Sequence, residues 1–141
     1  MSFPELFKNK NKDKCTEFAL LFEEQIKPFK IIEYDNNYSV ILDQSDYQYN
    51  WLSEVKEQSY YGDGHCYNDL FNDYLSSNFS KLNKKLNYDS ENGMFCVYCK
   101  NLFDAEEVAY ELSKLYKNEN KMIEWIKSTK EKYDYSFDIK I

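Results

Sequence analysis

Residues 86–99 read LNYDSENGMFCVYC, and this stretch sets the expected pairing of the central strands. Its second half is rich in aromatic and β-branched residues, which favour strands. The Asn92-Gly93 pair before it suits a tight connection between antiparallel strands, since both residue types tolerate a positive φ. We therefore predict a β-hairpin with strands Leu82–Tyr88 and Met94–Cys99.

A second hairpin is predicted upstream of this stretch. Segments Phe29–Tyr34 and Tyr38–Leu42 are also rich in β-branched and aromatic residues, and the intervening residues 35–37 are Asp-Asn-Asn, which suit a turn. The later segment alternates, so that one face would carry Tyr38, Val40 and Leu42.

The remaining segments mostly carry the helical period. Apolar residues recur at a spacing near 3.6 in four places: Asp13–Lys27, the segment from His65 after the Gly62-Asp63-Gly64 break, a segment with Asp104 as N-cap and Glu107 completing a capping box, and Glu119–Tyr133. Segment Ser45–Tyr61 fits a helix or a long loop, and Tyr135–Ile141 alternates like a closing strand. This order predicts an α+β fold, in which a mostly antiparallel sheet of two hairpins and a C-terminal strand is packed against helices within one domain over residues 1–141.

Composition and charge narrow the classes of partner. With 43% hydrophobic and 18% aromatic residues, the chain has the material for a core. Acidic residues outnumber basic ones by 25 to 18, and every cation is a lysine, which disfavours nucleic acid and nucleotide partners. No apolar run is long enough for a membrane span, and the polar, Lys-rich N-terminal segment does not resemble a signal peptide. We therefore expect a cytoplasmic protein with no membrane partner.

The cysteines and the single histidine are the residue types that could support metal binding or thiol chemistry. His65, Cys66, Cys96 and Cys99 are the best set for a metal, but residues three apart in a strand point to opposite faces, so Cys96 and Cys99 cannot easily hold one ion. His65 and Cys66 are adjacent and would point apart, with no third group to orient the imidazole. Two glycines at Gly62-Asp63-Gly64 are weak evidence for an anion site, since Asp63 would repel phosphate. The sequence predicts no metal, no cofactor and no enzymatic activity.

Two stretches together resemble a known family. Residues Gly62–Leu70, GDGHCYNDL, and Tyr88–Tyr98, YDSENGMFCVY, are similar to the two motifs of the immunity protein 51 family of bacterial polymorphic toxin systems. The second motif matches the family pattern Asp-x-Glu-x-Gly-Met-Phe fully. The first departs from Gly-Asn-Gly-aromatic-x-Trp, because it has Asp63, His65 and Tyr67 at the Asn, aromatic and Trp positions. The likeness covers residues 29–117.

The resemblance implies a non-enzymatic protein that binds a cognate toxin and neutralises it by direct contact. Charge would steer the encounter if the toxin is basic, and a few aromatic anchors would supply affinity. The residues expected to contact the toxin are Asp63, His65, Tyr67, Asp89, Glu91, Tyr60, Tyr61 and Trp51.

Other roles stay open at this stage. The aromatic residues could pack in the core, and Asp89, Glu91 and Gly93 could serve the turn, with Gly93 at a positive φ. A small-ligand or regulatory binding module using the Gly62–Tyr67 turn is the alternative function. An enzyme with Cys66 as nucleophile is a further class, and its thiol should alkylate faster than the others.

Overall fold

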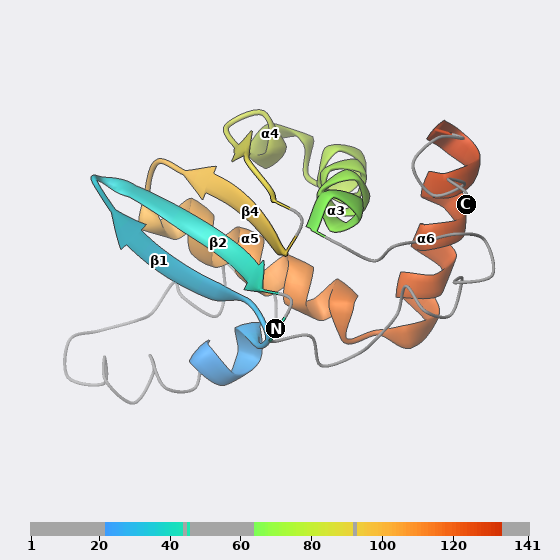
Figure 1. Cartoon of the computed structure of the whole chain (residues 1–141), viewed down its shortest axis with the longest axis horizontal. Helices are drawn as coiled ribbons and strands as arrows, with labels where there is room; N and C mark the ends of the chain where they lie inside the picture. Colours follow the sequence, from blue (N-terminus) through green and yellow to red (C-terminus); the bar gives the residue numbers. More distant parts are fainter. Residues whose placement is uncertain (1–21, 44, 46–63, 92, 134–141) are drawn as a thin grey trace.

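A computed structural model describes residues 22–43, 45, 64–91 and 93–133 of the chain (Figure 1). Residues 22–26 are helical and lead into the first hairpin. The elements that follow are, in chain order, β1 (Lys30–Tyr34), β2 (Asn37–Asp43), α3 (Gly64–Asn78), α4 (Ser80–Asn83), β3 (Asn87–Tyr88), β4 (Met94–Cys99), α5 (Leu102–Tyr116) and α6 (Glu119–Tyr133). The predicted α+β class is confirmed.

The described strands form a four-stranded antiparallel sheet in the order β1-β2-β4-β3. The first predicted hairpin is confirmed, with a turn one residue shorter than expected. Asp35 and Asn36 form this turn with φ values of 52° and 66°, and Asn37 already pairs with Tyr34. Two successive residues at positive φ match the right-handed twist of a tight hairpin, which explains why Asp and Asn occur here.

The second hairpin is confirmed in its turn and its second strand, but its first strand is shorter than predicted. The Glu91 and Met94 backbones exchange hydrogen bonds of 2.8 and 3.1 Å across the turn. Strand β3 is limited to Asn87–Tyr88, so the prediction of a strand from Leu82 was wrong. Leu82 and Leu86, four residues apart, both turn into the core from the short helix α4 and the turn after it, because this spacing suits a helical path better than a strand.

The sheet has two unlike faces. The pairs Val40–Val97 and Leu42–Phe95 lie on the inner face, where their side chains are fully buried. Helix α5 crosses behind this face, as Figure 1 shows, and its Ala105, Val108 and Leu112 join the core together with residues of α3 and α6. The outer face carries the alternate residues of each strand, and the members of the core cluster do not come from it.

The long helices agree with the periodicity of the sequence. Helix α6 has the predicted bounds, and its Met122 and Ile126 are buried. In α5 the apolar residues at helical spacing are buried, as the period predicts, but the N-cap is Asn101 and not Asp104. The Asn101 Oδ1 accepts from the Asp104 backbone N–H at 2.8 Å, and its side-chain amide donates to the Asp104 carboxylate at 3.1 Å, so the helix is capped three residues earlier than predicted.

Some predictions lie outside the described residues. For the predicted Asp13–Lys27 helix, the structure describes only residues 22–26 and the turn after them, where Phe22 and Ile26 are buried as expected. Residues 46–61 and the predicted closing strand Tyr135–Ile141 are not described. Across the described ranges, no helix combines the length and the apolar character that a membrane crossing requires.

Candidate functional site

The two motif stretches, which are far apart in the sequence, meet at the first turn of α3. Gly64, the first residue of α3, lies so close to the β3–β4 turn that a Cβ there would be 2.0 Å from the Glu91 carbonyl oxygen and 2.6 Å from the Met94 carbonyl. Glycine is therefore required by the close approach of two backbones. Because the backbone of the turn fills the space beside Gly64, that space is not open as a ligand cradle would need.

Hydrogen bonds join the same two segments. The Ser90 hydroxyl donates to the Asn68 side-chain oxygen at 2.7 Å and accepts from the Cys96 backbone N–H at 2.9 Å. One serine thus links α3, the turn and β4. The turn that carries Asp89 and Glu91 is held in place from both sides.

A cluster of buried aromatic rings packs beneath this junction, in the core of the protein. The rings of Tyr67 and Phe71 are stacked at 5.3 Å, and Phe71 meets Phe95 edge-on at 5.0 Å. Tyr67 is 1% exposed and also contacts the Tyr116 ring at 6.1 Å. The expectation that Tyr67 touches a partner does not fit this burial, because its side chain fills the core beneath the motif.

Three of the other residues expected to contact a partner lie on the surface. His65 is exposed on the first turn of α3, and Asp89 and Glu91 are exposed on the β3–β4 turn. The Tyr98 hydroxyl donates to the Asp89 carboxylate at 3.1 Å, and this hydrogen bond is the main cause of a raised pKa for the Tyr98 hydroxyl. The other expected contacts, Asp63, Trp51, Tyr60 and Tyr61, lie outside the described residues.

A shallow hollow of about 550 Å³ adjoins the turn. It is lined by Asp43, Ser45, Glu91, Gly93 and Met94, two of which are acidic residues. The Asp43 carboxylate accepts from the Ser45 backbone N–H at 2.9 Å and from its hydroxyl at 2.8 Å. These hydrogen bonds, backbone first, lower the pKa of Asp43, so this carboxylate presents oxygen acceptors to the hollow at neutral pH.

Comparison with protein-family models gives one decisive match, to immunity protein 51 over residues 29–131. This chain belongs to the immunity protein 51 family. The match extends past residue 117, where the motif likeness ended, and takes in most of α6. Comparisons with curated proteins and with solved structures gave no match.

Within the described residues, the thiols of this immunity protein 51 family member are withdrawn from solvent. Cys66, Cys96 and Cys99 are all buried and reduced. Burial raises the pKa of Cys96, and burial followed by the Asp104 charge raises the pKa of Cys99 to about 12. Cys99 belongs to the core on the inner face, whereas Cys96 pairs with Ile41 on the outer face. Within the described ranges, no three His, Cys, Asp or Glu side chains are grouped as a metal site would require.

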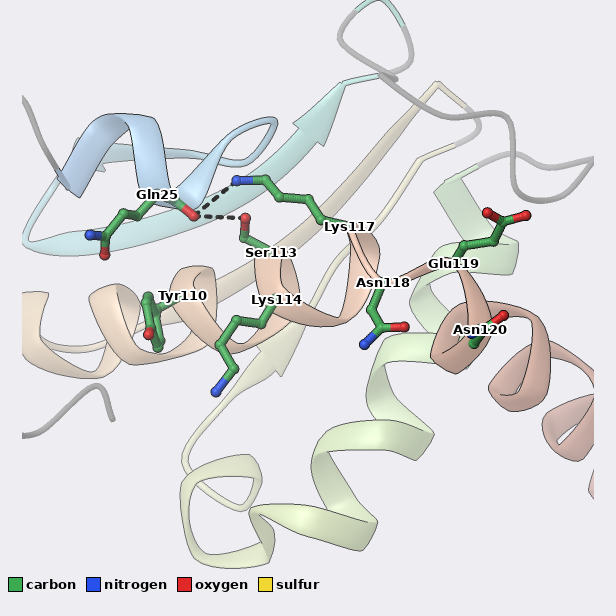
Figure 2. A pocket seen from close by; sticks show the side chains of 8 residues that line it. All are labelled: Gln25, Tyr110, Ser113, Lys114, Lys117, Asn118, Glu119 and Asn120. Carbon is green, nitrogen blue, oxygen red and sulfur yellow. Dashed lines mark hydrogen bonds between the residues drawn. The ribbon is translucent and has the colours of Figure 1, made fainter. Parts of the chain in front are cut away.

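A second hollow, of about 700 Å³, lies where the end of α5 meets the start of α6 and the residue 22–26 helix (Figure 2). The Ser113 hydroxyl donates to the Gln25 and Lys27 carbonyls at 2.8 and 2.7 Å, and the Lys117 ammonium donates to the Gln25 carbonyl at 3.2 Å. Burial lowers the pKa of Lys117. These groups bind the carbonyls at the C-terminal end of the 22–26 helix, where a cation is favoured, so their role is structural.

The second hollow could not be predicted from the sequence, since Ser113 and Gln25 are 88 residues apart. The raised pKa of Glu107 on α5 was also not predicted, because it depends first on how far the folded chain buries this carboxyl group. Burial, and then the charges of Glu111 and Asp104, raise the pKa of Glu107, while Lys85 opposes the shift. Lys85 itself pairs with Asp104 at 3.3 Å from the loop before β3.

Proposed function

We propose that this protein is an immunity protein that binds a cognate bacterial toxin in the cytoplasm and neutralises it by direct contact, without catalysing a reaction. The observation that carries this proposal is family membership over residues 29–131. The family name implies a toxin partner. A binding role requires only a surface of fixed shape and charge.

The structure of the motif junction supports binding. Asp89 and Glu91 are exposed on a turn that Gly64 and Ser90 fix in place, so little conformational entropy would be lost when a partner engages them. The chain carries a net charge of −7, which would speed encounter with a basic toxin. His65, Asp89 and Glu91 are therefore the described residues that we propose as toxin contacts.

The four expected contacts outside the described residues, Asp63, Trp51, Tyr60 and Tyr61, remain part of the proposal. Tyr67 is not proposed as a toxin contact, because its ring is buried and packs on Phe71 beneath the junction. A non-enzymatic role is consistent with thiols that are buried and, for Cys96 and Cys99, held at a raised pKa.

Co-expression tests the proposal in cells. The toxin domain encoded beside this chain is induced with this protein, with an empty vector, or with this protein opposite an unrelated toxin. Growth restored only in the matched pair supports a specific immunity protein. Growth arrest in the matched pair, with both proteins detected by immunoblotting, would contradict the proposal.

A further inference from the structure

The outer face of the sheet presents apolar side chains to solvent on β1, whereas Ile41 and Cys96 of the same face are buried. Ile32 and Tyr34 follow each other on this face of β1 and are 49% and 78% exposed. In the register of the sheet, Ile32 is level with Ser39, and Ser39 with Tyr98, which is half-buried. Ile32 and Tyr98, with Ser39 between them, thus form a row across three strands on the face of the sheet opposite α5, and Figure 1 shows this face of the sheet toward the viewer.

Carboxylates border this row at the β3–β4 end. Asp89 is joined to Tyr98 by the hydroxyl hydrogen bond, so the acid and the aromatic ring form one unit. Glu91 and Asp43 lie farther along, where they line the hollow together with Met94. Among the described strand and turn residues of this face, Lys30 is the cation, and its charge contributes to the lowered pKa of Asp43. Three carboxylates against one ammonium leave the described face negative.

The composition of this face fits a protein interface. Aromatic and large aliphatic side chains with a polar border are typical of binding hot spots, and Tyr supplies contact area with little loss of rotamer entropy. The acids lie on a turn that α3 holds through Gly64 and Asn68. Shape and charge are therefore preset on this face before any partner arrives.

We propose that the outer sheet face, defined by Ile32, Tyr34, Tyr98, Asp89 and Glu91, is the surface that docks the toxin. The occupant is a toxin surface with an apolar centre that covers Ile32 and Tyr34, flanked by Lys or Arg side chains that pair with Asp89 and Glu91. Charge complementarity selects this occupant, since a cationic partner offsets the carboxylates and a second copy of this acidic chain would add to them. The inference rests on the proposed function and names the surface through which it acts.

The apolar arm of the test uses isothermal titration calorimetry with the purified toxin domain encoded beside this chain, in an inactive form. The double variant Ile32→Ser/Tyr34→Ser should weaken binding by about thirtyfold, the effect of losing a hot spot. The matched control is Leu102→Ser/Phe103→Ser at the start of α5, where the side chains are 43% and 52% exposed. This control should bind like the wild type.

The charge arm measures association rates by stopped flow at low and high salt. Asp89→Asn/Glu91→Gln should slow association about tenfold at low salt and flatten its salt dependence. The control Glu119→Gln/Glu124→Gln removes two exposed acids from α6 and should keep nearly the wild-type salt dependence. Because both pairs change the net charge equally, a difference between them reports position. Circular dichroism melting of every variant separates a lost fold from a lost contact.

The outcomes distinguish the two claims. If the wild-type chain does not bind the toxin, the proposed function and this inference both fail. If the wild type binds and the outer-face variants bind as tightly and as fast as their controls, the docking surface is wrong while the function stands. Weakening confined to the folded outer-face variants, in either arm, supports the surface.

Discussion

Replacing Gly64 with alanine tests whether α3 is seated on the β3–β4 turn as the structure has it. The new Cβ would lie 2.0 Å from the Glu91 carbonyl oxygen and 2.6 Å from the carbonyl carbon and oxygen of Met94. All three are backbone atoms, so no side-chain rotation relieves the clash. To reach an ordinary contact of 3.4 Å, helix and turn must separate by about 1.4 Å.

That separation would break the junction. The Ser90–Asn68 hydrogen bond of 2.7 Å would be lost, at a cost of about 1 kcal/mol, and the packing of Phe71 on Phe95 would be disturbed. With the overpacking itself costing about 1 to 3 kcal/mol, and helix propensity returning up to about 1, we expect a net loss of about 3 kcal/mol. For a chain of this size the melting temperature should fall by about 10 °C.

Thermal and urea unfolding followed by circular dichroism measure this loss. Ser77→Ala is the matched control, since Ser77 is exposed on the same helix and gains only helix propensity. We expect the control to be as stable as the wild type or slightly more stable. A Gly64→Ala protein within about 0.5 kcal/mol of the wild type would refute the close approach of α3 and the turn.

Three further predictions concern single side chains. Ser90→Ala should cost about 1 to 2 kcal/mol in urea unfolding, because it removes the bond to Asn68 and leaves the Cys96 N–H without its acceptor; an unchanged midpoint would contradict the junction. Burial and neighbouring carboxylates raise the pKa of Glu107, so its contribution is favourable in acid and is lost as pH rises through the folded pKa. Glu107→Gln should accordingly raise the melting temperature by about 1 to 2 °C at pH 7 and by less near pH 4. A rise in melting temperature that is larger at pH 4 than at pH 7 would contradict the raised pKa of Glu107. Cys99, with a pKa of about 12, should react with iodoacetamide at pH 8 at least about a thousandfold more slowly in native protein than in urea by mass spectrometry, and fast native labelling would contradict its burial.

Local signals in the sequence predicted much of the fold. The period of α6 gave both of its ends, and the Asp-Asn and Asn-Gly pairs marked the two hairpin turns, because these features depend on residues a few positions apart. The errors were local ambiguities of the same kind. Asn101 and Asp104 both cap helices well, and the structure uses the first as the cap and the second inside the helix.

The candidate site was predicted only in part. The two motifs were found in the sequence, but their contact through Gly64 and Ser90 depends on residues more than twenty positions apart. Tyr67 was expected at the surface, yet the helical period that places it in α3 also turns it toward Phe71 and the core. The outer-face residues Ile32 and Tyr34 were assigned no role, since exposure depends on which sheet face the helices cover.

The measurement that tests the central claim most directly is a titration of the purified, active toxin with this protein, following the toxin's own activity. An immunity protein that acts by binding should abolish activity at a fixed molar equivalence, and the protein should be recovered from the inhibited complex chemically unchanged. Loss of toxin activity at far below one equivalent would show turnover and contradict inhibition by binding. Full toxin activity at a large excess of this protein would contradict the immunity function itself.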